Sequence, residues 1–307
     1  MSEIAAQDAA VYRQAVAGIV SDPAQKVGRL GGGPVRKTLD YVVLVLVAAL
    51  FVAPIAYMVI GSFKPSAEVL DGMAGFIPRD LSLDNYRGVF ARFSSPSTGY
   101  FANFYLTSTI VSVVIVGGGL VVNSLAGYAL ARLQWKGRNL VLGIVVLVVI
   151  LPFEAIAVPL FYLLNDYRNT YYVQFIPFVA NAFSIYLFYT FFIGIPRQIQ
   201  EAARIDGAGP WRTFFLIIVP MSKPVFASVT ILTFLAAWSS FLFPVMVIDQ
   251  PQFRPLPLAI SVFKAEPPTD WGQIFAFGVL LVLPVVIVFL LFQRWFVQSV
   301  ASSGLKG

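Results

Sequence analysis

The chain has 307 residues, of which 58% are hydrophobic and only 12% are charged, and its mean hydropathy is +0.81. This charged fraction is about half that of soluble domains, which excludes a soluble globular protein and indicates an integral membrane protein. The chain has no cysteine, no histidine and a net charge of +6 without a dense basic and aromatic stretch, which excludes disulfides, removes the commonest metal ligand and argues against a nucleic-acid partner.

Residues 1–36 form a polar tail that ends in Gly31-Gly32-Gly33-Pro34. The tail lacks the apolar core and cleavage site of a signal peptide, so no processing is expected. Ala9–Val20 could form a short amphipathic helix on the inner membrane surface, and a disordered tail is an equal alternative. No stretch continues a glycine-rich loop with Gly-Lys-Ser/Thr, so the chain is not expected to bind ATP through that motif.

Six apolar runs follow the tail, each near the roughly 20 residues that a helix needs to cross a bilayer. The predicted fold is therefore an all-α membrane protein with six transmembrane helices in one membrane domain, residues 37–307. Pro152 and Pro159 suggest that the third span is kinked, which would leave backbone groups near a cavity. The spans are expected at 40–62, 102–130, 140–163, 173–195, 225–248 and 273–296.

The distribution of Lys and Arg predicts the orientation in the membrane. Of the 21 basic residues, 14 fall in the tail with the adjoining Lys37, the 131–139 link, the 197–224 stretch and the C-terminal region. Eight of the 15 acidic residues fall on the opposite side. Because cytoplasmic loops carry an excess of Lys and Arg, both termini and the 197–224 stretch are predicted to be cytoplasmic.

The stretch Glu201–Pro220 predicts two short helices that meet at a corner and form a knob that could fill a cleft in another protein. Pro196 can open the first helix and Gly207 can stop it. Pro210 would open a second helix with an aromatic strip, and Pro220 would close that helix.

The spacing of Glu-Ala-Ala, Asp-Gly-Ala, an aromatic, an isoleucine and a proline over residues 201–220 resembles the EAA loop of permease subunits in binding-protein-dependent ABC importers. Ser222-Lys223-Pro224 is similar to the carbohydrate branch, typified by the second membrane subunit of the maltose importer. Further segments resemble the family in the expected order: Gly61–Lys64, Asn85-Tyr86, Asn123–Arg132, Arg294-Trp295 and residues 304–307.

This resemblance implies a subunit that forms half of the translocation pathway of a carbohydrate importer in the bacterial inner membrane. The implied partners are a homologous second permease, a cytoplasmic ATPase dimer, an extracytoplasmic solute-binding protein, membrane lipid and a carbohydrate substrate. ATP and Mg would be bound by the partner ATPase. The chain itself is expected to be non-catalytic and to hold no cofactor and no metal.

The resemblance also implies that the 197–224 loop docks into a cleft of the ATPase, with Glu201 facing a basic group. A local alternative is that Glu201 stabilises the first turn of its own helix through the helix dipole, worth about 0.3–1 kcal/mol. Gly207 would permit a backbone conformation that other residues resist, and Asp206 would brace the corner more than contact the partner. The remaining coupling candidates are Ala202 and Ala203, which would allow close approach, and Ala208.

Four residues are candidates for the substrate pathway. Glu154 is the only acid deep inside an apolar run, so it should face protein or water; it would line the pathway, or pair with a partner-subunit residue or a backbone amide. Asn181 and Tyr186 could bind a sugar or make helix contacts. Ser239 and its neighbour Ser240 stand where the family usually has an asparagine and an acid, so the contacts of that pair are changed here.

Two other classes of function compete with this interpretation. A secondary transporter or channel acting alone would leave the 201–220 knob unexplained, and the spans hold few ionisable residues for ion coupling. An intramembrane enzyme would need acid–base or metal chemistry, for which the spans hold almost no suitable residues.

Overall fold

A computed structural model describes residues 34–70, 80–265 and 269–304. The chain divides into two compact units, residues 1–57 and 58–307. Within the described residues the protein is helical, apart from a hairpin of two short antiparallel strands, β1 (Ser94–Ser95) and β2 (Gly99–Tyr100). The predicted amphipathic helix at 9–20 lies outside the described residues. An all-α membrane fold is confirmed.

Five stretches of the described chain are long and apolar enough to cross a membrane. They belong to α2 (Pro34–Gly61), α4 (Phe101–Arg132), α7 with α8 (Tyr171–Val179 and Ala182–Ile193), α12 with α13 (Lys223–Trp238 and Leu242–Val247) and α16 (Trp271–Gly304). A sixth span is present if α5 (Arg138–Ile150) and α6 (Phe153–Leu163) are counted together.

The third predicted span is not one kinked helix. Its two halves, α5 and α6, meet at an angle of 103°. Leu151 is extended and Pro152 occupies the N-cap position of α6, as expected because proline disfavours a helical conformation in the residue before it. The 140–163 run is therefore a broken span, with a sharper bend than the sequence suggests.

Short elements complete the chain outside these spans. The helix α2 begins at Pro34, inside the predicted tail, where a proline in the first turn loses no hydrogen bond. The remaining elements outside the 197–221 region are η2 (Ser66–Glu68), α3 (Asp84–Arg92), η4 (Asn165–Tyr167), η6 (Pro251–Phe253), α14 (Leu256–Ala259) and α15 (Ser261–Ala265).

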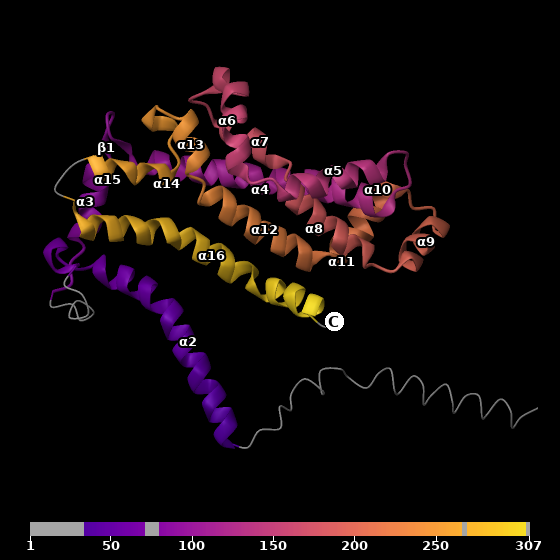
Figure 1. Ribbon diagram of the computed structural model, residues 1–307, viewed down its shortest axis with the longest axis horizontal. Coiled ribbons are helices and arrows are strands. Elements are labelled where there is room, and N and C mark those ends of the chain that lie inside the picture. The colour runs from indigo at the N-terminus through magenta and orange to yellow at the C-terminus, as the bar shows by residue number, and fades with distance from the viewer. Residues whose placement is uncertain (1–33, 71–79, 266–268, 305–307) are drawn as a thin grey trace, which may run out of the picture. The chain divides into compact units, whose positions relative to one another are not determined.

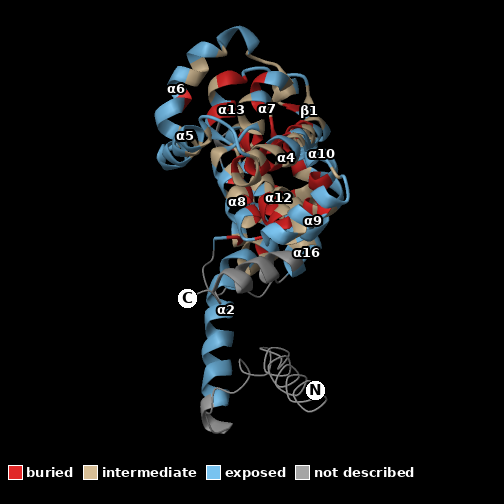
Figure 2. Ribbon diagram, turned by 90° about the vertical axis from the view of Figure 1, so that its right-hand side faces the viewer, coloured by how far each residue is buried: buried red, intermediate tan, exposed pale blue. Residues whose placement is uncertain are grey.

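Helix α4 lies at the centre of the second unit. It packs against α7, α8 and α12, and α12 also packs against α16 (Figure 1). Gly127 lets α4 approach α8 closely, because an added Cβ would lie 2.6 Å from the Cβ of Phe188 and 3.0 Å from the backbone nitrogen of Tyr189. Small residues play this part in membrane helix pairs. Buried residues gather around α4, α7 and α12, whereas α5 is largely exposed (Figure 2).

Three spans of this unit are interrupted midway. The first break separates α5 from α6, the second lies at Ala180-Asn181 between α7 and α8, and the third lies at residues 239–241 between α12 and α13. The runs predicted at 173–195 and 225–248 are thus confirmed as spans, but each is built from two helices. The breaks leave backbone groups without helical partners at mid-span, and such groups need partners in the protein.

Candidate functional site

The region Arg197–Met221, called the corner here, consists of two short helices as predicted. The first helix, α9, ends in a turn in which Gly207 has a φ of +78°. The amide of Ala208 donates to the carbonyl of Ala203 (2.8 Å), and that of Gly207 to the carbonyl of Arg204 (3.1 Å). This pair of bonds is the Schellman motif, which requires a left-handed residue. The elements are α9 (Arg197–Ile205), α10 (Pro210–Thr213), η5 (Phe214–Ile218) and α11 (Val219–Met221).

The second helix of the corner does not end at Pro220. It continues to Met221 because η5 is a π-helical segment, in which the amide of Val219 donates to the carbonyl of Phe214. A proline inside a helix lacks one amide and crowds an earlier carbonyl, and a widened turn accommodates both effects. The prediction that Pro220 closes the helix was wrong for this reason.

The inner face of the corner is fixed to the transmembrane helices. Phe214 and Ile218 are buried in a core cluster that includes Tyr128 of α4 and Phe192 of α8. The hydroxyl of Tyr128 donates to the carbonyl of Pro210 (3.4 Å). At the same end of α4, Arg132 donates to the carbonyls of Phe192 and Ile195, directly before α9 begins. These contacts tie both corner helices to the end of α4.

The outer face of the corner carries the predicted coupling residues. Glu201, Ala202, Asp206 and Gly207 are exposed and Ala208 is half-buried. Within the described chain the carboxylate of Glu201 makes no hydrogen bond and no ion pair. The second helix of the corner carries an exposed aromatic pair, since the rings of Trp211 and Phe215 stack with centroids 6.3 Å apart.

Two expectations for the corner change with the structure. Ala203 is only 5% exposed, so it packs inside the chain and only Ala202 offers a small outer surface. Glu201 is the fifth residue of α9, and the first turn of that helix contains no acid. Because the helix dipole acts within the first turn, the local alternative for Glu201 was wrong. Asp206 holds the C-cap position through its backbone, whose amide donates to the carbonyl of Ala202.

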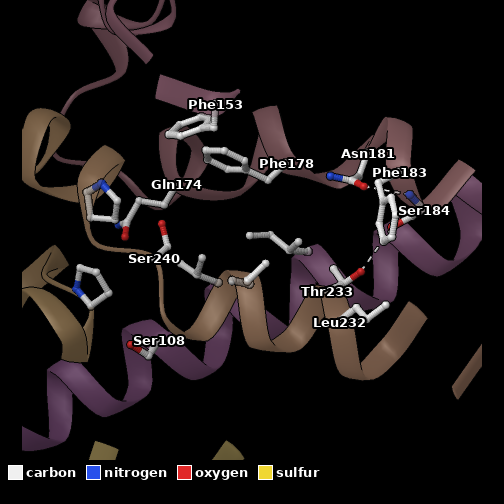
Figure 3. A pocket seen from close by; sticks show the side chains of 16 residues that line it. Ser108, Phe153, Gln174, Phe178, Asn181, Phe183, Ser184, Leu232, Thr233 and Ser240 are labelled. Atoms are coloured by element: carbon white, nitrogen blue, oxygen red, sulfur yellow. Dashed lines mark hydrogen bonds between the residues drawn. The ribbon is translucent and has the colours of Figure 1, made fainter. Parts of the chain in front are cut away.

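A second candidate site is a cavity of about 300 Å³ inside the second unit. It is bounded by α4, α6, α7, α8, α12 and α13 and touches all three helix breaks. The side chains of Gln174 and Ser240 lie at one end and those of Asn181, Ser184 and Thr233 at the other (Figure 3). The polar and aromatic side chains that line it are Ser108, Phe153, Gln174, Phe178, Asn181, Phe183, Ser184, Thr233 and Ser240.

The break between α7 and α8 is stabilised by an asparagine of α4. The Nδ2 of Asn123 donates to the carbonyl of Val179 (3.0 Å), and its Oδ1 accepts from the amide of Asn181 (2.9 Å). The Oδ1 of Asn181 then caps α8 by accepting from the amide of Ser184 (2.9 Å). These bonds fix the break and give partners to the carbonyl of Val179 and the amide of Asn181.

Only some of the predicted pathway residues line the cavity. Asn181 lines the cavity. Tyr186 instead lies against Tyr189 on the next turn of α8, with ring centroids 6.3 Å apart and ring planes tilted by 32°. The hydroxyl of Ser239 donates to the carbonyl of Leu235 in its own helix (2.6 Å). Neither of these residues contributes to the cavity lining.

Glu154 also lies outside the cavity lining, in the first turn of α6. It is exposed on the described chain, whereas its neighbour Phe153 faces the cavity. Glu154 is therefore not enclosed by the described part of this chain, and its role in the pathway or in pairing with a partner-subunit residue stays a prediction.

Sequence reasoning missed Gln174, and it named Ser240 only as the neighbour of Ser239. Gln174 carried a usable signal, since an amide inside an apolar run is costly unless it has a partner. Ser240 carried none of its own, because it differs from Ser239 only in position around a helix end.

Comparisons with known proteins identify a family of membrane transport proteins. Residues 119–302 match the family of binding-protein-dependent transport system inner membrane components. The chain is 30% identical to the arabinooligosaccharides transport system permease protein AraQ of Halalkalibacterium halodurans, over 89% of this chain and 98% of that protein. It is 29% identical to the lactose transport system permease protein LacG of Rhizobium radiobacter, over 86% of this chain and 95% of that protein.

A solved structure has the same fold. The crystal structure of a bacterial ABC transporter involved in the import of the acidic polysaccharide alginate contains a similar chain, with a TM-score of 0.72 and 22% identity. The match covers 85% of this chain and 96% of that chain.

Proposed function

The chain belongs to the family of binding-protein-dependent transport system inner membrane components, and from this membership we propose that it forms half of the translocation pathway for a carbohydrate. It is a permease subunit of an ABC importer. The carbohydrate class is supported by the names of two relatives, which carry arabinooligosaccharides and lactose. The other half of the pathway would come from a homologous second permease.

The corner would couple this subunit to a cytoplasmic ATPase dimer. The observation that carries this proposal is that the corner exposes both an unpaired carboxylate, Glu201 of α9, and the rings of Trp211 and Phe215 on its second helix. An exposed apolar pair and a free charge on one two-helix corner suit a partner surface with a cleft and a basic group. Both termini and the corner would lie in the cytoplasm, as the distribution of basic residues predicts.

The mechanism would need no bond chemistry in this chain. Closure of the ATPase on ATP would move the corner, and the bonds from Tyr128 and Arg132 would carry that movement to α4. Because α4 packs on α7, α8 and α12, its displacement would change the opening of the pathway. A solute-loaded binding protein would deliver the carbohydrate from outside. Such a two-state element is biased by its partners rather than by chemistry of its own.

The first experiment is affinity purification of this chain from its native membrane, followed by identification of the proteins that accompany it. We expect an ATPase and a second permease. Glu201→Lys should lower ATPase recovery by at least about tenfold, because reversing an interfacial charge leaves two like charges facing each other. Asp166→Lys is the matched control, since Asp166 is also an exposed acid but lies in η4, away from the corner.

Two outcomes would contradict the proposal. Purification of the wild-type chain without any ATPase would favour a transporter or channel that acts alone. Retention of the ATPase by Glu201→Lys would remove Glu201 from the coupling surface.

A further inference from the structure

We infer that the cavity is a binding site for an uncharged, hydroxyl-bearing part of the transported solute, so that this subunit contacts a neutral sugar. The inference rests on the proposed function, and it adds both the place of contact and the charge class of the carbohydrate. The relatives and the structural neighbour do not fix that class, because their names include lactose and an acidic polysaccharide.

The position of the cavity is the first argument. Each of the three broken spans contributes lining residues at its break: Phe153 where α6 begins, Phe178 and Asn181 between α7 and α8, and Ser240 between α12 and α13. Transporters form solute sites from discontinuous helices, because a break presents polar groups at a depth where intact helices offer none. A cavity of about 300 Å³ lies at the small end of the range for small-molecule sites, roughly 300–1,000 Å³.

An unsatisfied buried group is the second argument. Gln174 is only 3% exposed. Its Nε2 donates to the carbonyl of Phe253 (3.0 Å), which fixes the orientation of the amide, while its Oε1 has no hydrogen-bond partner. A buried acceptor without a partner is costly. Gln174 lines the cavity, so a small rotation of its amide would let the covered Oε1 accept from a sugar hydroxyl, and Ser240 lies at the same end (Figure 3).

The charge of the lining is the third argument. Of the described residues that line the cavity, none is Asp, Glu, Lys or Arg. A carboxylate or phosphate entering it would lose water and gain no cation, which is strongly unfavourable in a low-dielectric site. An uncharged sugar would keep its hydroxyls bonded at the two polar ends. Its apolar CH face would lie on Phe153 and Phe178, whose ring centroids are 5.6 Å apart.

The absence of cysteine from the chain makes a direct test possible. Ser240→Cys would be placed in the complex purified with its partners, and its modification by N-ethylmaleimide followed on this chain by mass spectrometry. The probes are lactose and arabinotriose as neutral sugars and digalacturonate as an acidic one. A neutral probe at about ten times its Kd should slow the reaction about tenfold, and digalacturonate should leave it unchanged.

Ser239→Cys is the matched control, because its side chain stands one residue away and points to its own helix; no probe should protect it. Gln174→Leu, added to Ser240→Cys, should abolish protection by the neutral sugar. An unchanged modification rate without sugar would show that the cavity still forms in that variant.

The inference is overturned if digalacturonate protects Ser240→Cys, if Gln174→Leu leaves protection intact, or if neither neutral sugar protects. The last result would mean that a lipid chain or a segment of the second permease occupies the cavity. The complex used here already contains the ATPase and the second permease, so these failures would leave the proposed function standing. Absence of those partners would instead contradict the proposed function.

Discussion

The α7–α8 break and the corner both interrupt helices, yet they satisfy the freed backbone groups in opposite ways. The corner uses its own backbone, with Gly207 in a left-handed conformation and Ala208 bonded to the carbonyl of Ala203. The break depends on another helix, because Asn123 of α4 supplies both an acceptor and a donor. The corner is stabilised by local hydrogen bonds, whereas the break is stabilised by tertiary contacts with another helix.

This difference follows from the surroundings. A helix end in water can leave its remaining groups to the solvent, so the side chains of the corner stay available to a partner. A helix end inside the bilayer has no water, so a partner side chain must be built in. The corner can therefore carry charges such as Glu201, whereas the break carries amides and hydroxyls and lines a neutral cavity.

The largest effect is expected from Asn123→Leu, which removes both bonds at the α7–α8 break. Leaving a buried amide or carbonyl unpaired costs about 1–3 kcal/mol for each group. The thermal midpoint of the purified complex in detergent would measure this loss. Asn181→Ala removes only the cap to Ser184 and should cost about 1 kcal/mol. If Asn123→Leu is no more destabilising than Asn181→Ala, the break does not depend on α4.

A smaller, local effect is expected from Gly207→Ala. The added Cβ meets no atom within 4 Å, so the cost is the left-handed conformation itself, about 1–2 kcal/mol. Amide hydrogen exchange in the peptides covering residues 203–213 should speed up by roughly 5- to 30-fold. Gly209→Ala is the control, because Gly209 has an ordinary φ of −70° and open space around it. Equal exchange in the two variants would exclude the conformational explanation.

The smallest effect is expected from Tyr128→Phe, which tests the link between α4 and the corner. The ring packing with Phe214 is kept, and only the 3.4 Å bond to the carbonyl of Pro210 is lost. A single hydrogen bond of this kind is worth about 0.5–1.5 kcal/mol. The thermal midpoint should fall slightly, and exchange should speed up near residues 210–213. Tyr105→Phe, which alters a ring packed on Trp238, should leave those residues unaffected.

Local chemistry made part of this architecture predictable. The apolar runs placed the spans, and the glycine and proline positions placed the corner, including the left-handed turn at Gly207. Asn181 was predicted as a pathway candidate and lies in the cavity lining. In each case the deciding physics acts within a few residues, through hydropathy, φ angles or helix caps.

The remainder depends on contacts between distant segments. Ala203 and Ala202 differ only in which side of α9 meets the core, and a nine-residue helix does not reveal that side. Asn123 and Asn181 are 58 positions apart, so nothing near either residue indicates their bond. Gln174 and Ser240 lie 66 positions apart on two different spans, and they line one cavity only because those spans pack together and both break there.

The dependence of the α7–α8 break on α4 also has a consequence for the order of the helices along the chain. A growing chain delivers its N-terminal segments first, so the amide of Asn123 is in place before residues 171–193 are made. This later segment has a mean hydropathy of 1.7, the lowest of the five spans that are long enough without joining α5 to α6, against 3.2 for Trp271–Arg294. In a circular permutant that placed residues 171–193 ahead of α4, this polar break would enter the bilayer before Asn123 was available to bind it.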